Sequence, residues 1–77
     1  MKDSDKYLKV VRWSEEDQVY IGRCPQIIHG GIHGDDEVEV NTDLCALVEE
    51  TVNDMLRDGF KLPEPALDEL MKLLEDR

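Results

Sequence analysis

Apolar and polar positions in the first half of the chain follow the short period that is typical of strands. Three runs are rich in β-branched and aromatic residues, which suit a pleated sheet. These runs span residues 7–13, 19–24 and 26–34. A polar loop at 14–18 joins the first two runs and predicts an antiparallel hairpin. The third run follows Pro25 and contains Gly30 and Gly31, which often mark a bulge or a close backbone approach.

The first run, 7–13, carries apolar side chains in both phases of its alternation. Successive side chains of a strand point to opposite faces of the sheet. We therefore expect this strand to be covered on both sides.

From residue 36 the pattern changes to that of an amphipathic helix. With residues placed about 100° apart, the apolar positions fall within one arc, whereas Asp43, Glu50 and Asp54 fall on the other side. Gly59 follows the last periodic residue and suits the helix C-terminus. We predict a long helix within 36–59, packed on the sheet. Its apolar arc consists of Val40, Leu44, Leu47, Val48, Thr51, Val52 and Met55, with Cys45 at the edge.

The stretch HGGIHGDDEVEV, residues 29–40, contains the start of this helix. Asp36 suits the N-cap position and Glu39 follows three residues later, as in a capping box. Acidic residues are also favourable beside the partial positive charge of a helix N-terminus. The alternation in EVEV leaves a strand through Val38–Val40 as the alternative.

The remaining segments complete a single α+β domain over residues 1–77. Residues 1–6 are expected to be a flexible tail, and the two prolines at 60–65 predict a break. Residues 66–77 predict a short second helix. Its apolar face contains our candidates for an oligomer interface, Leu67, Leu70, Met71 and Leu74. That face could equally cover the core of its own domain.

The net charge of −10 is concentrated in the second half of the chain. Residues 1–34 carry five basic and five acidic side chains, whereas residues 35–77 carry four basic and fourteen acidic ones. Such a field repels phosphates, so we expect no direct binding of nucleic acid. It attracts a basic partner, and Asp43, Glu50 and Asp54 are the candidate contacts. Solubility alone is the other explanation of an acidic surface.

Potential metal ligands are present, but their spacing does not favour a site. The candidates are Cys24, His29, His33 and Cys45. In a continuous strand, the Cα atoms of His29 and His33 would stand about 13 Å apart, too far to share one metal. A small enzyme or metal-binding protein that uses Cys24, His29, His33 and Asp35 remains the alternative. We expect no metal, no cofactor and no catalytic activity.

The sequence also predicts where the protein resides. The N-terminus is polar and lacks the apolar core of a signal peptide, and no apolar run approaches the roughly 20 residues that span a bilayer. The two cysteines are then expected to be reduced thiols. We expect a cytoplasmic protein that does not associate with membranes.

The order of elements and a set of short motifs resemble the HicB-like antitoxin family, whose domain is described as a partial ribonuclease H-like fold. WSEED lies at the hairpin turn, Cys-Pro ends the second run, Gly-Asp precedes the helix, and DG-x-x-LPEP follows it. The similarity covers residues 7–65. The matching residues are Trp13, Ser14, Glu15, Glu16, Asp17, Tyr20, Cys24, Pro25, Gly34, Asp35, Asp58, Gly59, Leu62, Pro63, Glu64 and Pro65.

The resemblance implies a function in protein binding. Such a domain is expected to bind and block a small basic RNA-cleaving toxin of the HicA type and to form homo-oligomers. It is not expected to retain the catalytic carboxylates of ribonuclease H. We expect a short member of the family without a DNA-binding extension. The alternative is a stand-alone oligomeric structural or regulatory protein with the same fold and no toxin partner.

Overall fold

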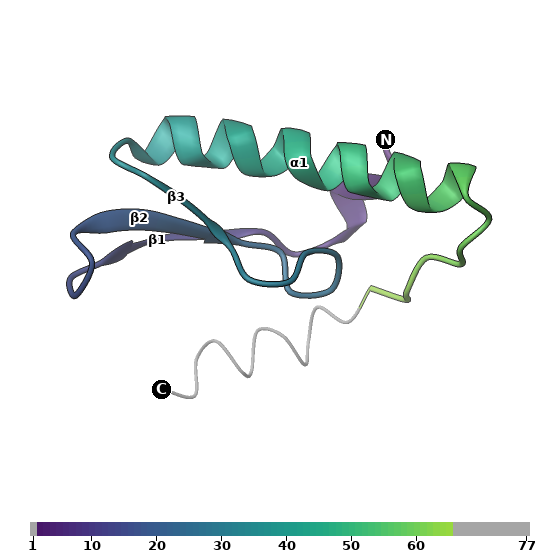
Figure 1. Ribbon diagram of the computed structural model, residues 1–77, viewed down its shortest axis with the longest axis horizontal. Coiled ribbons are helices and arrows are strands. Elements are labelled where there is room, and N and C mark those ends of the chain that lie inside the picture. The colour runs from purple at the N-terminus through teal and green to yellow at the C-terminus, as the bar shows by residue number, and fades with distance from the viewer. Residues whose placement is uncertain (1, 66–77) are drawn as a thin grey trace.

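The computed structural model describes residues 2–65, which form one antiparallel sheet covered by a long helix. The elements are the 3-10 helix η1 (Asp3–Lys6), the strands β1 (Val10–Ser14), β2 (Val19–Arg23) and β3 (Ile32–Gly34), and the helix α1 (Glu37–Arg57). The strand order is β1-β2-β3, and α1 runs along one face of the sheet (Figure 1). This arrangement confirms the predicted α+β class. The helix predicted at 66–77, with Leu67, Leu70, Met71 and Leu74, lies outside the described residues.

The hairpin forms as its sequence predicts. β1 pairs with β2 from Val10 opposite Arg23 to Ser14 opposite Val19. The turn between the strands closes when the Gln18 N–H donates to the Ser14 carbonyl oxygen over 2.8 Å. On the face toward α1, the rings of Trp13 and Tyr20 meet edge to face with centroids 5.1 Å apart, a favourable aromatic geometry.

Both ends of α1 follow from local sequence signals. The Asp36 carboxylate accepts a hydrogen bond from the Glu39 N–H over 2.9 Å, so Asp36 is the N-cap. At the other end, Gly59 adopts a left-handed φ of 83°, and the Phe60 N–H donates to the Met55 carbonyl oxygen over 2.9 Å. This is the Schellman arrangement, in which glycine is favoured. Because α1 includes Val38–Val40, the strand alternative for that stretch is wrong.

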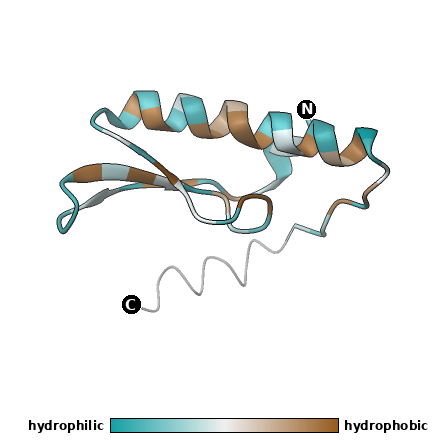
Figure 2. Ribbon diagram, in the orientation of Figure 1, coloured by the Kyte–Doolittle hydropathy of each residue, from teal (hydrophilic) through white to brown (hydrophobic). Residues whose placement is uncertain are grey.

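The apolar arc of α1 supplies much of the hydrophobic core. Val40, Leu44, Val48 and Val52 are buried, and hydrophobic bands recur along the helix in Figure 2. Leu47, Thr51 and Met55, at the margins of the predicted arc, are partly buried. The core cluster also contains Tyr7 and Cys24, with partly buried Val11, Ile27, Ile28, Ile32 and Leu62 packed against it. The 3.6-residue period therefore identified the buried face correctly.

The third strand is shorter than predicted, because only Ile32–Gly34 pairs with β2. The Cys24 carbonyl oxygen accepts hydrogen bonds from the N–H groups of Ile27 (3.1 Å) and Ile28 (2.9 Å), which makes a turn. Gly30 then takes a left-handed φ of 78°, which strands do not use. The prediction of a strand over 26–31 is wrong because this stretch folds back over the core instead.

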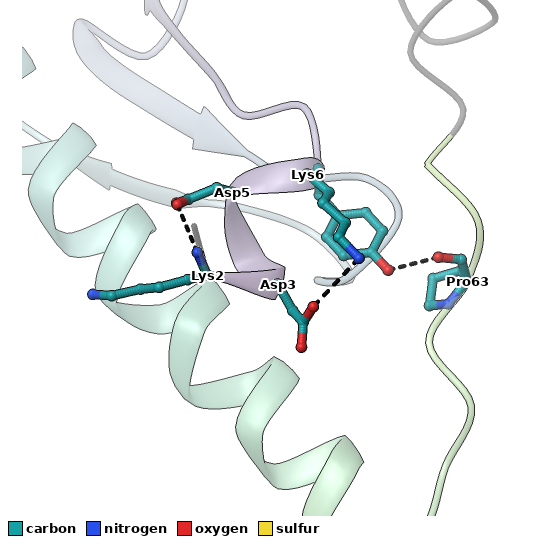
Figure 3. Close-up of polar contacts among 6 residues, drawn as sticks. Lys2, Asp3, Asp5, Lys6 and Pro63 are labelled. Atoms are coloured by element: carbon teal, nitrogen blue, oxygen red, sulfur yellow. Dashed lines mark hydrogen bonds and ion pairs between the residues drawn. The ribbon is translucent and has the colours of Figure 1, made fainter.

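The N-terminal segment contains a helical element that the sequence analysis does not predict. Residues 3–6 form η1, in which Ser4 is buried, and the Lys2 ammonium lies 3.0 Å from the Glu49 carboxylate of α1. Figure 3 shows the local contacts, including the 3.3 Å ion pair between Lys6 and Asp3. Residues 3–6 thus form a 3-10 helix beside α1, whereas the flexibility predicted for residues 1–6 stays a prediction. The predicted strand start at residue 7 is wrong, because β1 begins at Val10.

Glycine in the sheet lets α1 approach closely. A Cβ atom at Gly34 would stand 2.9 Å from Cγ2 of Val40, and one at Gly22 would stand 3.0 Å from Cγ1 of the same residue. Such distances are shorter than normal van der Waals contacts between carbons. The glycines on the helix-facing side therefore set the spacing between the sheet and α1.

The substitution Gly34→Ala should lower the free energy of unfolding by about 1–3 kcal/mol, as expected for overpacking a core. In a Val40→Ala background the same substitution should cost less, because the clashing methyl group is gone. Urea unfolding of the four proteins in this cycle measures the coupling. An equal cost in both backgrounds would show that contact with Val40 is not the reason for glycine at this position.

Candidate functional site

One side of α1 is strongly acidic. α1 carries six acidic residues and one basic residue. Of the predicted partner contacts, Asp43 and Glu50 are exposed, and the Asp54 side chain retains 48% of its accessible surface. The helix therefore brings all three predicted residues to one side that does not face the sheet, as their spacing requires.

The carboxylates of Asp43, Glu50 and Asp54 differ in their hydrogen bonds and ion pairs. Asp54 accepts a hydrogen bond from the Arg57 guanidinium over 2.7 Å, one turn along the helix. In the described part of the chain, neither Asp43 nor Glu50 takes part in a side-chain hydrogen bond or an ion pair. Asp43 and Glu50 therefore offer the more available negative charge.

Glu39 belongs to the same side but was interpreted from the sequence only as part of the helix start. It lies four residues before Asp43, and residues spaced by four share a face. Its side chain is exposed, whereas its N–H is bonded to Asp36. We define the acidic stripe as Glu39, Asp43, Glu50 and Asp54. Glu39 can be assigned to this side from the sequence, because it lies four residues before Asp43.

The potential metal ligands do not form a cluster. Cys24 is fully buried, whereas His29, His33 and Cys45 are exposed on different parts of the fold. Within residues 2–65, no three side chains among His, Cys, Asp and Glu lie close enough to hold a metal ion. The 13 Å separation estimated for the histidines assumed a continuous strand, and that premise is wrong because β3 begins only at Ile32.

The two cysteines should differ sharply in reactivity. Burial raises the pKa of the Cys24 thiol above its ordinary value of 9.0, which keeps it in the protonated, unreactive form. In iodoacetamide labelling at neutral pH, we expect one alkylation, at the exposed Cys45, and a second only in denaturant. The variant Cys45→Ser should remain unlabelled while folded, and rapid labelling of it would contradict the burial of Cys24.

The same burial sets a pH dependence of stability. A thiol whose pKa is raised by folding contributes stability below its unfolded pKa, and that contribution declines as the pH rises through the folded pKa. The stability that Cys24 contributes is therefore lost at alkaline pH, above pH 9.0.

No family model, no curated protein and no solved structure matches the chain. Within residues 2–65, no helix has the length and apolar character required to cross a membrane.

Proposed function

We propose that the chain is an antitoxin-like protein-binding module that neutralises a small basic RNA-cleaving toxin of the HicA type. The observation that carries the proposal is the acidic stripe on α1, with exposed carboxylates at Asp43 and Glu50 that make no internal ion pair in the described residues. The resemblance of residues 7–65 to HicB-like antitoxins supplies the class of partner.

The stripe provides a physical mechanism for neutralisation. A basic surface that binds RNA phosphates also attracts carboxylates, and complementary charges accelerate the encounter of two proteins. Asp43 and Glu50 lie two turns apart, about 10.5 Å along the helix axis. Carboxylates held at this spacing on a rigid helix would occupy the cationic surface that the toxin uses for RNA, so the chain needs no catalytic group of its own.

The family resemblance also supports a homo-oligomer, with Leu67, Leu70, Met71 and Leu74 as the proposed interface. The double variant Leu70→Asp with Leu74→Asp tests this assignment. If the segment joins subunits, light scattering should report a smaller mass for the variant than for the parent chain. An unchanged mass removes this segment as the interface.

Co-expression with the product of the neighbouring gene, where that product is a small basic chain, tests the proposed function. We expect the two proteins to co-purify at low salt. The complex should weaken as salt is raised, because the screening length falls from about 10 Å at 0.1 M to about 3 Å at 1 M. Failure to co-purify at low salt would contradict the proposal and favour a stand-alone regulatory protein.

A further inference from the structure

The segment that follows α1 is not held by secondary structure. Residues 60–65, which we call the strap, contain neither helix nor strand. Pro63 and Pro65 have no N–H to donate, and among residues 2–65 no backbone-to-backbone hydrogen bond reaches residues 61–65. The attachment of the strap to the domain therefore depends on contacts with side chains.

Two hydrogen bonds join the strap to segments that are distant in the sequence. The Tyr7 hydroxyl donates to the Pro63 carbonyl oxygen over 2.6 Å, the contact drawn as a dashed line at Pro63 in Figure 3. The Gln26 side-chain amide donates to the Glu64 carbonyl oxygen, also over 2.6 Å. The first bond is partly buried, whereas the second is exposed. A hydrogen bond is stronger where water is partly excluded, so we expect the bond from Tyr7 to contribute more.

The strap buries little apolar surface. Leu62 and Pro63 are partly buried, and none of residues 60–65 is fully buried. Leu62 packs against the core cluster that contains Tyr7 and Cys24, whereas Phe60 retains 63% of its accessible surface. Segments with few buried apolar contacts open at a lower free energy than the whole domain unfolds. The strap has this character, and α1, with four buried side chains, does not.

The strap lies against the part of the core that contains Cys24. The Cys24 side chain has no accessible surface and belongs to the cluster on which Leu62 packs. Gln26, which bonds to the strap, follows Cys24 by two residues. In Figure 1 the strap descends from the end of α1 beside the loop between β2 and β3. Departure of the strap is therefore expected to uncover the margin of the core at this thiol.

We propose that the strap opens as a unit while the sheet and α1 stay folded, and that the Tyr7 hydroxyl is its latch. In the closed state the strap keeps the Cys24 thiol inaccessible, and in the open state the thiol can react. One hydrogen bond between residues 56 positions apart thus controls the reactivity of a buried group. The acidic stripe of α1 takes part in neither bond of the strap. The inference therefore goes beyond the proposed function and does not depend on it.

Removal of the latch hydroxyl tests the proposal. In a Cys45→Ser background Cys24 is the one remaining thiol. A chromogenic aromatic disulfide, which reacts with thiols faster than iodoacetamide, detects rare opening by thiol–disulfide exchange. Tyr7→Phe keeps the ring and loses the hydrogen bond, so the open state should gain about two- to tenfold in population. We expect the reaction of Cys24 in the folded protein to accelerate by the same factor.

Tyr20→Phe is the matched control. It removes the other tyrosine hydroxyl of the chain, which makes no hydrogen bond within residues 2–65, and it should leave the rate unchanged. Leu62→Ala is a second variant, which weakens the packing of the strap and should also accelerate the reaction. Circular dichroism verifies that each variant is folded. The proposal fails if folded Tyr7→Phe reacts no faster than Tyr20→Phe, or if Leu62→Ala has no effect on the rate.

Urea separates opening of the strap from unfolding of the domain, and this measurement needs only the Cys45→Ser chain. The sensitivity of an equilibrium to urea scales with the surface that it exposes, and a short strap exposes little. We expect the reaction rate of Cys24 to stay nearly constant at urea concentrations below the unfolding transition. A rate that rises in parallel with the unfolding equilibrium would show that Cys24 is reached only in the unfolded chain, which overturns the proposal.

Discussion

Replacing Leu44 with alanine should lower the free energy of unfolding by about 2–5 kcal/mol. Leu44 has no accessible surface and belongs to the cluster that joins α1 to the sheet. Its truncation loses buried apolar surface and leaves a cavity under the middle of α1. The core of so small a domain supplies only about 3–5 kcal/mol in total. The loss is therefore expected to unfold a large share of the molecules at room temperature.

The matched control is Leu56→Ala, the same chemical change on the same helix. Leu56 retains 47% of its accessible surface, and surface substitutions usually alter stability by no more than about 0.5 kcal/mol. Urea unfolding followed by circular dichroism compares the two variants. If both truncations cost the same, α1 does not bury the face assigned to it.

Reversing two charges of the acidic stripe should produce the largest loss of function. The double variant Asp43→Lys with Glu50→Lys replaces two exposed carboxylates by ammonium groups that a basic partner repels. Close charge pairs at protein interfaces contribute roughly 1.5 kcal/mol or more each, so the affinity for the toxin should fall by at least about tenfold. Titration calorimetry with the purified partner at low salt measures this loss.

A second double variant with the same change in net charge distinguishes the effect of the acidic stripe from the effect of the protein's total charge. Glu16→Lys with Glu64→Lys makes the same change in net charge at two exposed residues outside α1. This control should retain most of the affinity, because attraction at close range depends on position whereas steering depends on total charge. Similar losses in the two double variants would show that the stripe is not the contact surface.

The helix was predictable because its determinants are local or periodic. The spacing of Val40, Leu44, Val48 and Val52 needs no knowledge of the partner sheet to identify a buried face. Asp36 and Gly59 mark the ends through the chemistry of capping, and both act as expected in the structure. The same period placed Asp43 and Glu50 on the exposed side, so the main members of the acidic stripe were also predictable.

Predictions failed where distant contacts override local composition. Residues 26–31 are apolar enough for a strand, yet the Cys24 carbonyl oxygen draws Ile27 and Ile28 into a turn over the core. Residues 3–6 are polar enough for a tail, yet η1 forms with Ser4 buried, and Lys2 beside it pairs with Glu49 of α1. Lys2 and Glu49 are far apart in the sequence, as are Ile27 and Ile28 from the core residues of α1 on which they pack, whereas the turn at Cys24 is local. Neither the apolar pattern nor residue propensity predicts these contacts.

The identity of the partner follows from neither pattern nor fold. An acidic helix face specifies the sign of the charge that it attracts, but many basic proteins share that property. The toxin class in our proposal comes from the motif resemblance over residues 7–65, including Cys24-Pro25 and the stretch Leu62-Pro63-Glu64-Pro65. The proposed site rests on the acidic stripe, whereas the proposed partner rests on the motif resemblance. Each proposal therefore requires its own test.

Inhibition of RNA cleavage tests the central proposal most directly. The purified chain is titrated into the small basic product of the neighbouring gene, and cleavage of a labelled RNA is followed at each ratio. Neutralisation predicts that cleavage falls to background near stoichiometric amounts of the chain and that the Asp43→Lys, Glu50→Lys variant requires a large excess. Cleavage that continues unchanged in an excess of the native chain would contradict the account.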